Sequence, residues 1–384
     1  MKLPSLFEQM STLVGLPSVS CTQSEFDQPN EAVIEQLATW LADIGFRCQV
    51  QKVLPGKANL IARLGDGDGG LVLSGHTDTV PFDEDLWSSN PLRLSERNDR
   101  WYGLGTCDMK GFFPLAIEAV RRLNPQTMKA PLTILATCDE ESSMSGARAL
   151  VEDGSPLGRA AIIGEPTNLQ PIRLHKGVMM ERIDILGQSG HSSDPSYGHS
   201  ALDAMHDAMG ALIQLRQTWA KTHLEPAFAV PYPTLNLGCI HGGDNPNRIC
   251  GHCHLEFDIR PIPGMSVETI RETIDRRLEV ISKNHGVQAT RTALFPGLLP
   301  FEQPIGELTR MAEELTGQAA SSVAFGTEAP YLQSLGLETI VLGPGEIACA
   351  HQPDEHLALR TIEPTIQVLQ GFINRYCVES EYDR

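Results

Sequence analysis

The sequence is poor in basic residues. Lys and Arg number 30 against 48 Asp and Glu, which leaves a formal net charge of −18 at pH 7. A protein that binds nucleic acid needs a basic surface for the phosphates, so this balance argues against nucleic acid as a partner. It does not exclude a small substrate, because the charge of one site can differ in sign from that of the whole surface.

Long apolar runs are absent as well. No stretch approaches the unbroken apolar length of a membrane span, and the first five residues lack the apolar core of a signal peptide. The nine cysteines are an odd number in a chain of 384 residues, which fits reduced thiols better than a disulfide framework. We therefore expect a cytoplasmic protein that has no membrane partner.

One cysteine pattern suggests a cofactor. Residues 250–254 read Cys-Gly-His-Cys-His, which matches the Cys-x-x-Cys-His pattern of haem attachment. The residues that follow, however, alternate between apolar and polar, as on a strand with one buried face. Because the chain also lacks an export signal, we interpret this segment as a strand and not as a haem site.

The length of the chain and the order of its expected strands and helices predict two domains. Residues 1–177 and 291–384 alternate apolar strands with amphipathic helices, which predicts an α/β domain with a mostly parallel central sheet. The expected helices are 30–44, 110–123 and 305–316, and the expected strands are 59–64, 71–74, 132–137, 161–163 and 339–343.

Residues 178–290 follow a different order. Strands are expected at 180–186, 234–241, 252–260 and 287–294, and helices at 200–219 and 267–281. This β-α-β-β-α-β order is the split βαβ unit of a ferredoxin-like α+β fold. We therefore expect an inserted domain of this fold within the α/β domain.

Five short runs place histidines and carboxylates beside small or turn-forming residues. They are Gly-His-Thr-Asp at 75–78, Cys-Asp-Met-Lys-Gly at 107–111, Cys-Asp-Glu-Glu at 138–141, Gly-Glu-Pro-Thr at 164–167 and Ala-His-Gln-Pro-Asp-Glu at 350–355. Their imidazoles and carboxylates form a nitrogen and oxygen donor set that suits two cations such as Zn²⁺. A paired-metal site with an open position can activate water, so the pattern predicts a di-metal hydrolase.

Each candidate ligand has a simpler interpretation when it is taken alone. The pair His76 and Asp78 fits a surface turn, Asp108 fits a helix N-cap, and adjacent acids fit a solvated loop. Three of the runs, however, directly follow predicted strands, and ligands of open α/β sheets bind beyond the carboxyl ends of the strands. This shared placement favours a metal site over the simpler interpretations.

The adjacent acids Glu140 and Glu141 follow a buried strand, where unpaired carboxylates are unfavourable. Successive side chains point apart, so one of the pair can ligate a metal while the other faces bound water. We expect the neighbouring Asp139 to be solvated.

Longer runs give the chain a family resemblance. They are Gly-His-Thr-Asp-Thr-Val-Pro-Phe at 75–82, Tyr-Gly-Leu-Gly-Thr at 102–106, Gly-Gln-Ser-Gly-His-Ser-Ser-Asp-Pro at 187–195, Pro-Tyr-Pro-Thr-Leu-Asn-Leu-Gly at 231–238 and Ala-His-Gln-Pro-Asp-Glu at 350–355. Over nearly its whole length the chain resembles the di-zinc metallohydrolases, which include aminoacylases, peptidases and N-acyl amino-acid deacylases. The resemblance implies hydrolysis of an N-acylated amino acid, two Zn²⁺ per chain with Co²⁺ as a substitute, and a homodimer.

The resemblance also implies which residues hold the metals. His76 and Glu165 would hold one zinc. Glu141 and His351 would hold the other, and Asp108 would bridge the two.

The resemblance implies further roles beside the metals. Asp78 would orient His76, and the Asp108–Met109 peptide bond would be cis. Glu140 would be the general base, which takes the proton of a water between the metals and passes a proton to the leaving amine.

The substrate-binding residues are expected in and beside the inserted domain. The resemblance implies that His191 reaches the partner subunit's active site, and that Asn247 and Arg260 bind substrate. Glu328, in the run Gly-Thr-Glu-Ala-Pro, is expected to pair its negative charge with an ammonium group of the substrate. The alternative is that Glu328 is a solvated loop carboxylate.

Two kinds of alternative function remain open. A desuccinylase or a metallocarboxypeptidase of the same family would differ only in its pocket residues. A catalytically silent metal-binding or regulatory protein on the same fold is a different class. The presence of Glu140 beside a complete ligand set argues against a silent protein.

Overall fold

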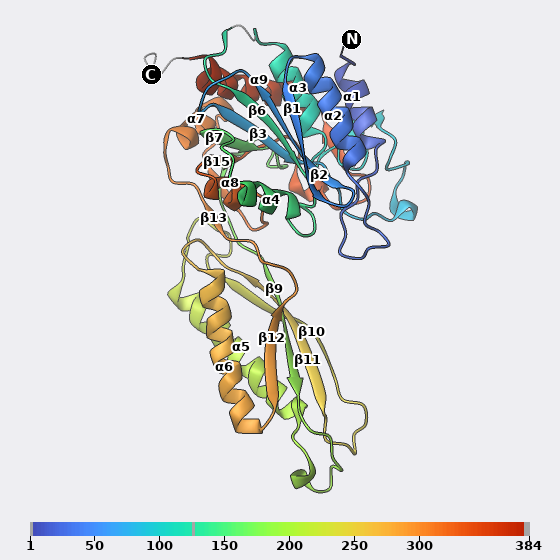
Figure 1. Cartoon of the computed structure of the whole chain (residues 1–384), viewed down its shortest axis with the longest axis vertical. Helices are drawn as coiled ribbons and strands as arrows, with labels where there is room; N and C mark the ends of the chain where they lie inside the picture. Colours follow the sequence, from blue (N-terminus) through green and yellow to red (C-terminus); the bar gives the residue numbers. More distant parts are fainter. Residues whose placement is uncertain (1–2, 125–126, 380–384) are drawn as a thin grey trace. The chain divides into compact units, whose positions relative to one another are not determined.

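The computed structural model describes residues 3–124 and 127–379 of the chain, which divides into two compact units (Figure 1). Unit 1 consists of Met1–Arg173, Gln303–Ser321 and Thr327–Arg384. Unit 2 consists of Leu174–Glu302 and Ser322–Gly326, and it contains the segment 178–290 in which an inserted domain is expected.

Among the described residues, a nine-stranded mixed sheet forms the centre of unit 1. Along its main path the strands are β1 (Arg47–Leu54), β2 (Lys57–Leu64), β6 (Leu132–Thr137), β3 (Leu71–His76), β7 (Ala160–Ile163), β15 (Glu338–Val341), β8 (Ile172–His175) and β13 (Phe301–Glu302), while β14 (Ser321–Val323) pairs with β8. The four strands from β6 to β15 run parallel, whereas β1, β2, β8 and β13 pair antiparallel. The predicted parallel sheet is thus confirmed for its centre.

Helices cover both faces of the sheet in unit 1 (Figure 1). The apolar core joins the sheet to five helices, α1 (Leu6–Val14), α2 (Glu31–Asp43), α3 (Phe112–Arg121), α7 (Glu307–Thr316) and α9 (Ile362–Ile373), the last of which continues into a π-helical turn at Asn374–Val378. On the opposite face lie α4 (Ser145–Asp153) and α8 (Ala329–Ser334). Every residue of β3 and β6 is buried, as expected for parallel strands covered on both sides.

A small antiparallel sheet accompanies the large one. Its strands are β4 (Ser95–Arg97), β5 (Arg100–Tyr102) and β16 (His356–Ala358). The pairing of β16 with β5 joins the chain just after the His351 run to the chain just before the Asp108 run. Two candidate ligand loops that are distant in sequence are thereby fixed to one another.

Unit 2 has the predicted β-α-β-β-α-β order. The elements are β9 (Met179–Leu186), α5 (Ala201–Thr222), β10 (Thr234–Gly242), β11 (His252–Arg260), α6 (Val267–His285) and β12 (Gln288–Ala293). The strands form one antiparallel sheet in the order β10-β11-β9-β12, and α5 and α6 pack on one face of it (Figure 1). Among the residues that the structure describes, no helix of this unit covers the other face, and we call that face the open face.

Among the described residues, no helix combines the length and the apolarity that crossing a bilayer requires.

Candidate metal centre

The candidate ligands of unit 1 lie where the parallel strands end. His76 is the last residue of β3, Glu141 follows β6, and Glu165 follows β7. Because β3 lies between β6 and β7 and parallel to both, these residues meet at the same edge of the sheet. Two loops add Asp108, just before α3, and His351, just before β16.

Asp108 lies between the two candidate histidines. Its Oδ1 is 3.0 Å from His76 Nε2, and its Oδ2 is 3.3 Å from His351 Nε2. One carboxylate thus presents a separate oxygen to each imidazole, which is the arrangement that a bridging ligand needs.

Each histidine also has a glutamate beside it. Glu141 Oε1 is 2.9 Å from His351 Nε2, and Glu165 Oε1 is 3.9 Å from His76 Nε2. The donor atoms of His76, Asp108 and Glu141 all lie within 4.8 Å of one another. The five residues therefore form two half-sites that share Asp108.

Close packing brings Glu165 to this place. Gly164 precedes it, and a Cβ at Gly164 would stand 2.2 Å from the ring of Phe112. Only glycine fits there, so the chain after β7 can pass close to the start of α3.

Asp78 contacts both half-sites. Its backbone carbonyl is 3.0 Å from His76 Nδ1, whereas its carboxylate Oδ1 is 3.7 Å away. The carboxylate Oδ2 instead accepts a hydrogen bond of 3.0 Å from the backbone N–H of Glu141. The nearer partner of the imidazole is thus the main chain of Asp78, a detail that residue type alone does not reveal.

The Asp108 loop is held by a residue for which the sequence predicts no role. The buried Glu355 accepts hydrogen bonds from the backbone N–H groups of Cys107 and Asp108 at 2.8 and 3.0 Å. Burial raises the pKa of Glu355 to about 7. The sequence feature that could have indicated this role is the position of Glu355, four residues after His351 in the same run. The Asp108–Met109 peptide bond is cis, as the resemblance implies.

The charges of the site shift its titrating groups strongly. Burial alone would lower the pKa of His76, but Asp108 and the neighbouring carboxylates raise it well above its usual value. Contacts with Asp108 and Glu141 raise the pKa of His351 to about 10. Burial raises the pKa of Glu140 well above its usual value, and the charges of Glu165 and Glu141 raise it further. The site therefore concentrates negative charge that a cation would neutralise.

Asp139 corrects an expectation. It is 4% exposed and not solvated. Its carboxylate is 2.9 Å from Lys57 Nζ and accepts hydrogen bonds from Ser20 and Ser145 at 3.0 and 2.7 Å. The sequence does not show this, because Lys57 and Ser20 approach Asp139 only through the fold. Asp139 is a structural anchor of the loop that presents Glu140 and Glu141.

Glu328 is also buried, at 1% exposure, so it is not a solvated loop carboxylate. Its Oε2 accepts a hydrogen bond of 2.9 Å from Thr137 Oγ1, at the end of β6. Its Oε1 has no hydrogen-bond partner among the described residues. Burial raises the pKa of Glu328 to about 7.

The remaining predicted residues belong to unit 2. His191 is exposed, and its Nδ1 accepts hydrogen bonds from Ser193 N–H and Oγ at 3.2 and 2.7 Å. The exposed Asn247 is on the neighbouring loop, where its carbonyl accepts from the N–H of Ser192 at 3.2 Å. Arg260, the last residue of β11, donates to Asp258 at 3.0 Å. Unit 2 thus brings the His191 and Asn247 loops together.

Comparison with known proteins shows the family to which the chain belongs. The model of the peptidase family M20/M25/M40 matches residues 72–375, a range that includes every candidate ligand. The chain belongs to this family. The M20 match spans both units, so it covers the sheet-edge site and the antiparallel sheet of unit 2 together.

M20 relatives align over nearly the entire chain. An acetylornithine deacetylase of Aliivibrio salmonicida is 45% identical over 98% of this chain and 100% of its own length. An acetylornithine deacetylase of Klebsiella pneumoniae is 47% identical over 98% of both chains. This chain thus aligns with nearly the full length of both relatives.

Solved structures show the same M20 fold. The aminopeptidase PepT of Bacillus cereus has a TM-score of 0.74 at 21% identity, covering 97% of this chain and 98% of that chain. An M20 metallo-carboxypeptidase of Sulfolobus solfataricus has a TM-score of 0.74 at 16% identity, covering 97% and 99%. At these identities the likeness concerns the fold.

Proposed function

We propose that this M20 enzyme hydrolyses N²-acetyl-L-ornithine to L-ornithine and acetate, as a cytoplasmic step of arginine biosynthesis. The observation that carries the reaction class is the pair of half-sites around Asp108 with Glu140 beside them. The substrate is proposed from the acetylornithine deacetylases that are 45% and 47% identical over nearly the whole chain.

The residues present fit two divalent metal ions. Two imidazoles and three carboxylates offer nitrogen and oxygen donors, the set that Zn²⁺ and Co²⁺ accept. Glu165 Oε1 is buried without a hydrogen-bond partner among the described residues, as a donor awaiting a cation would be. We propose that His76 and Glu165 hold one ion, that His351 and Glu141 hold the other, and that Asp108 bridges them. When bound, such ions lower the pKa of water and polarise a carbonyl.

Glu140 is the proposed general base. Its carboxylate stands beside the half-sites, where it interacts electrostatically with Glu165 and His76, and its neighbour Glu141 contacts His351. The carboxylate takes a proton from the attacking water as the C–O bond forms at the acetyl carbon. It then gives a proton to the ornithine nitrogen as the amide C–N bond breaks. Asp78 holds the His76 ring and the Glu141 backbone in place meanwhile.

The residues of unit 2 complete the proposal. Asn247 and Arg260 bind the substrate, and the enzyme is a homodimer in which His191 serves the active site of the partner subunit. Its imidazole donates a hydrogen bond to the oxyanion that forms at the acetyl carbonyl. The exposure of His191 and Asn247 on adjoining loops supports their availability to a ligand.

A substrate panel tests the function. Purified enzyme supplied with Zn²⁺ or Co²⁺ is assayed with N²-acetyl-L-ornithine, N-succinyl-diaminopimelate and N-acetylmethionine. The highest kcat/KM is expected for acetylornithine. A preference for the succinyl substrate would instead favour the desuccinylase alternative, and an enzyme without turnover on any amide would favour a silent metal-binding protein.

Metal removal is expected to abolish activity. Without cations the site contains several carboxylates in close contact, and no group remains to lower the pKa of water. Dialysis against a chelator should eliminate turnover, and Zn²⁺ or Co²⁺ should restore it, with metal content followed by elemental analysis. Fully active enzyme with fewer than about one ion per chain would contradict a two-metal mechanism.

Glu328 is expected to select the charged substrate. Its free Oε1 suits the ammonium at the end of the ornithine side chain. In the variant Glu328→Gln, KM for acetylornithine should rise by about tenfold or more, because a hydrogen bond to a charged group contributes about 1.5–3 kcal/mol. N-acetylmethionine, which has no side-chain charge, is the matched control and should be hardly affected. An equal change for both substrates would show that Glu328 serves only the structure.

A further inference from the structure

The open face of the sheet in unit 2 carries a row of potential metal ligands. Asp184 on β9 pairs with His254 on β11, and His254 pairs with His241 on β10. Residues paired across neighbouring strands point to the same face, so these three side chains share one face. His252 lies two positions before His254 on β11 and therefore points to that face as well.

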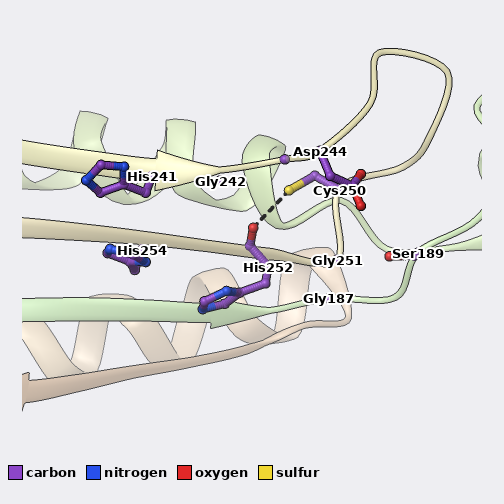
Figure 2. Close-up of a pocket in the computed structure, with 10 residues that line it drawn as sticks. Gly187, Ser189, His241, Gly242, Asp244, Cys250, Gly251, His252 and His254 are labelled. Carbon is purple, nitrogen blue, oxygen red and sulfur yellow. Dashed lines mark hydrogen bonds between the residues drawn. The ribbon is translucent and has the colours of Figure 1, made fainter.

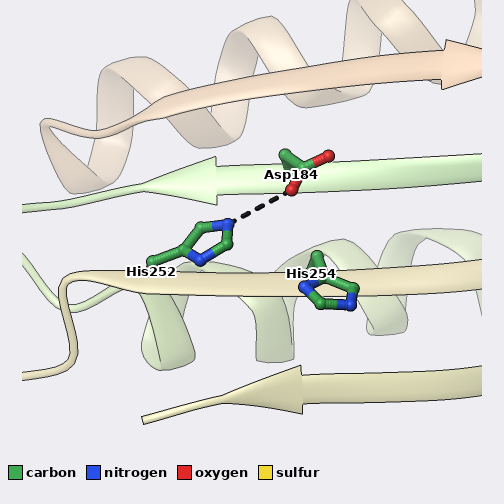
Figure 3. Close-up of side chains that lie close together, drawn as sticks. All are labelled: Asp184, His252 and His254. Carbon is green, nitrogen blue, oxygen red and sulfur yellow. Dashed lines mark hydrogen bonds and ion pairs between the residues drawn. The ribbon is translucent and has the colours of Figure 1, made fainter.

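Three of these side chains converge. His252 Nε2 is 3.2 Å from Asp184 Oδ1, and one donor atom from each of Asp184, His252 and His254 lies within 4.8 Å of the others (Figure 3). The imidazole of His254 forms no hydrogen bond or ion pair with any other described residue. Its ring is tilted against the rings of His241 and His252, by 42° and 38°, with centroids 5.2 and 5.8 Å away. Its nitrogens are therefore available to a ligand.

Asp184 is prepared to act as an anionic ligand. Arg182 donates to both of its oxygens, at 2.8 and 2.9 Å. These two hydrogen bonds fix the orientation of the carboxylate, as groups behind a metal ligand commonly do. The side chains of Asp184 and His252 are 26% and 49% exposed, so an ion can reach them from solvent.

The sheet provides room beside these ligands. A hollow of about 420 Å³ lies at this end of the sheet, with His241, His252 and His254 in its wall (Figure 2). Glycines and polar groups complete the lining, namely Gly187, Ser189, Gly242, Gly243, Asp244, Cys250 and Gly251. An ion held by three side chains would keep a coordination position open to this hollow.

We propose that unit 2 binds one divalent ion of the Zn²⁺ type through Asp184, His252 and His254, a site that shares no residue with the M20 metal centre. Two imidazoles and one carboxylate suit Zn²⁺, Ni²⁺ or Cu²⁺, whereas Mg²⁺ and Ca²⁺ prefer oxygen donors alone. His241, next in the row, offers a further nitrogen. The segment Cys-Gly-His-Cys-His at 250–254 thus contributes both of its histidines to the proposed metal site without binding haem.

Metal stoichiometry tests the proposal without any measurement of activity. Metal-free full-length protein is dialysed against buffers of fixed free Zn²⁺ concentration, and zinc per chain is counted by elemental analysis. The wild-type chain is expected to bind one ion more than the variant His254→Gln. Binding at this site should weaken about tenfold or more in the variant, since even changes behind a ligand cost about 10- to 100-fold.

A matched control comes from the same unit. His206 on α5 is exposed and contacts Asp207, and His285 contacts Asp207 as well. Among the described residues, however, these three side chains do not form a group whose donor atoms all lie within 4.8 Å of one another. The variant His206→Gln should therefore retain the full zinc content. His252→Gln, at a half-exposed position, gives an independent test if His254→Gln fails to fold. Equal zinc content in wild-type, His254→Gln and His252→Gln chains would overturn the proposal.

Discussion

The variant Glu140→Ala is expected to retain its metal and its fold while losing most of its turnover of acetylornithine. A positioned general acid–base contributes about 10²–10⁴-fold to the rate, and Glu140 is proposed to act in both proton transfers. The fold should persist because Asp139, and not Glu140, anchors this loop through Lys57 and two serines. The measurements are kcat and zinc content of the same preparation.

The adjacent residue provides the control. Glu141 is 2.9 Å from His351, so Glu141→Ala should weaken metal binding, and excess Zn²⁺ should recover part of its activity. Added metal should not recover Glu140→Ala. If both variants lose metal to the same extent, the assignment of one as base and the other as ligand is wrong.

Mixed dimers are expected to regain activity that neither parent has. His191→Ala should lower kcat by about 10²–10³-fold, the usual effect of removing one donor to an oxyanion. When these chains are mixed with Glu140→Ala chains, each heterodimer contains one site that lacks both groups and one site that has both. Activity should therefore return, to about one quarter of the wild-type value for random pairing of equal amounts.

The complementation experiment also tests the simpler interpretation of His191. The hydrogen bonds from Ser193 show that this imidazole orders its own turn. If that were its whole role, or if His191 acted within its own chain, every site in the mixture would lack one group. A mixture that is shown to exchange subunits and yet stays inactive would contradict a shared site.

The sequence predicted one strand of the metal centre and one strand of unit 2 with the bounds that the structure shows, and the reason is physical. Both β6 and β11 have the predicted bounds, because a fully buried strand and an alternating strand leave distinct apolar patterns. The short strands β4, β5 and β16 were not predicted, because three residues are too few to show an alternation of apolar and polar side chains. Their pairing depends on segments that lie far apart in the chain.

The misjudged residues share one cause. Asp139 was expected in solvent, and Glu355 was given no role, because a carboxylate in a loop is usually solvated. What buries each of them is a partner distant in sequence: Lys57 for Asp139, and the backbone N–H groups of Cys107 and Asp108 for Glu355. Residue type and local spacing show which groups can ligate a metal, but not which groups the fold uses to hold those ligands.

The position of Glu355 links the two half-sites mechanically. His351, in one of them, and Glu355, which holds the backbone at the shared Asp108, are four residues apart in a single loop. That loop is fastened in turn by the pairing of β16 with β5. A displacement of the loop would therefore move His351, a proposed terminal ligand, and loosen Asp108, the proposed bridging ligand, together. Mutations that disturb it, even at positions that touch no donor atom, should therefore weaken the metal binding that is proposed for each half-site.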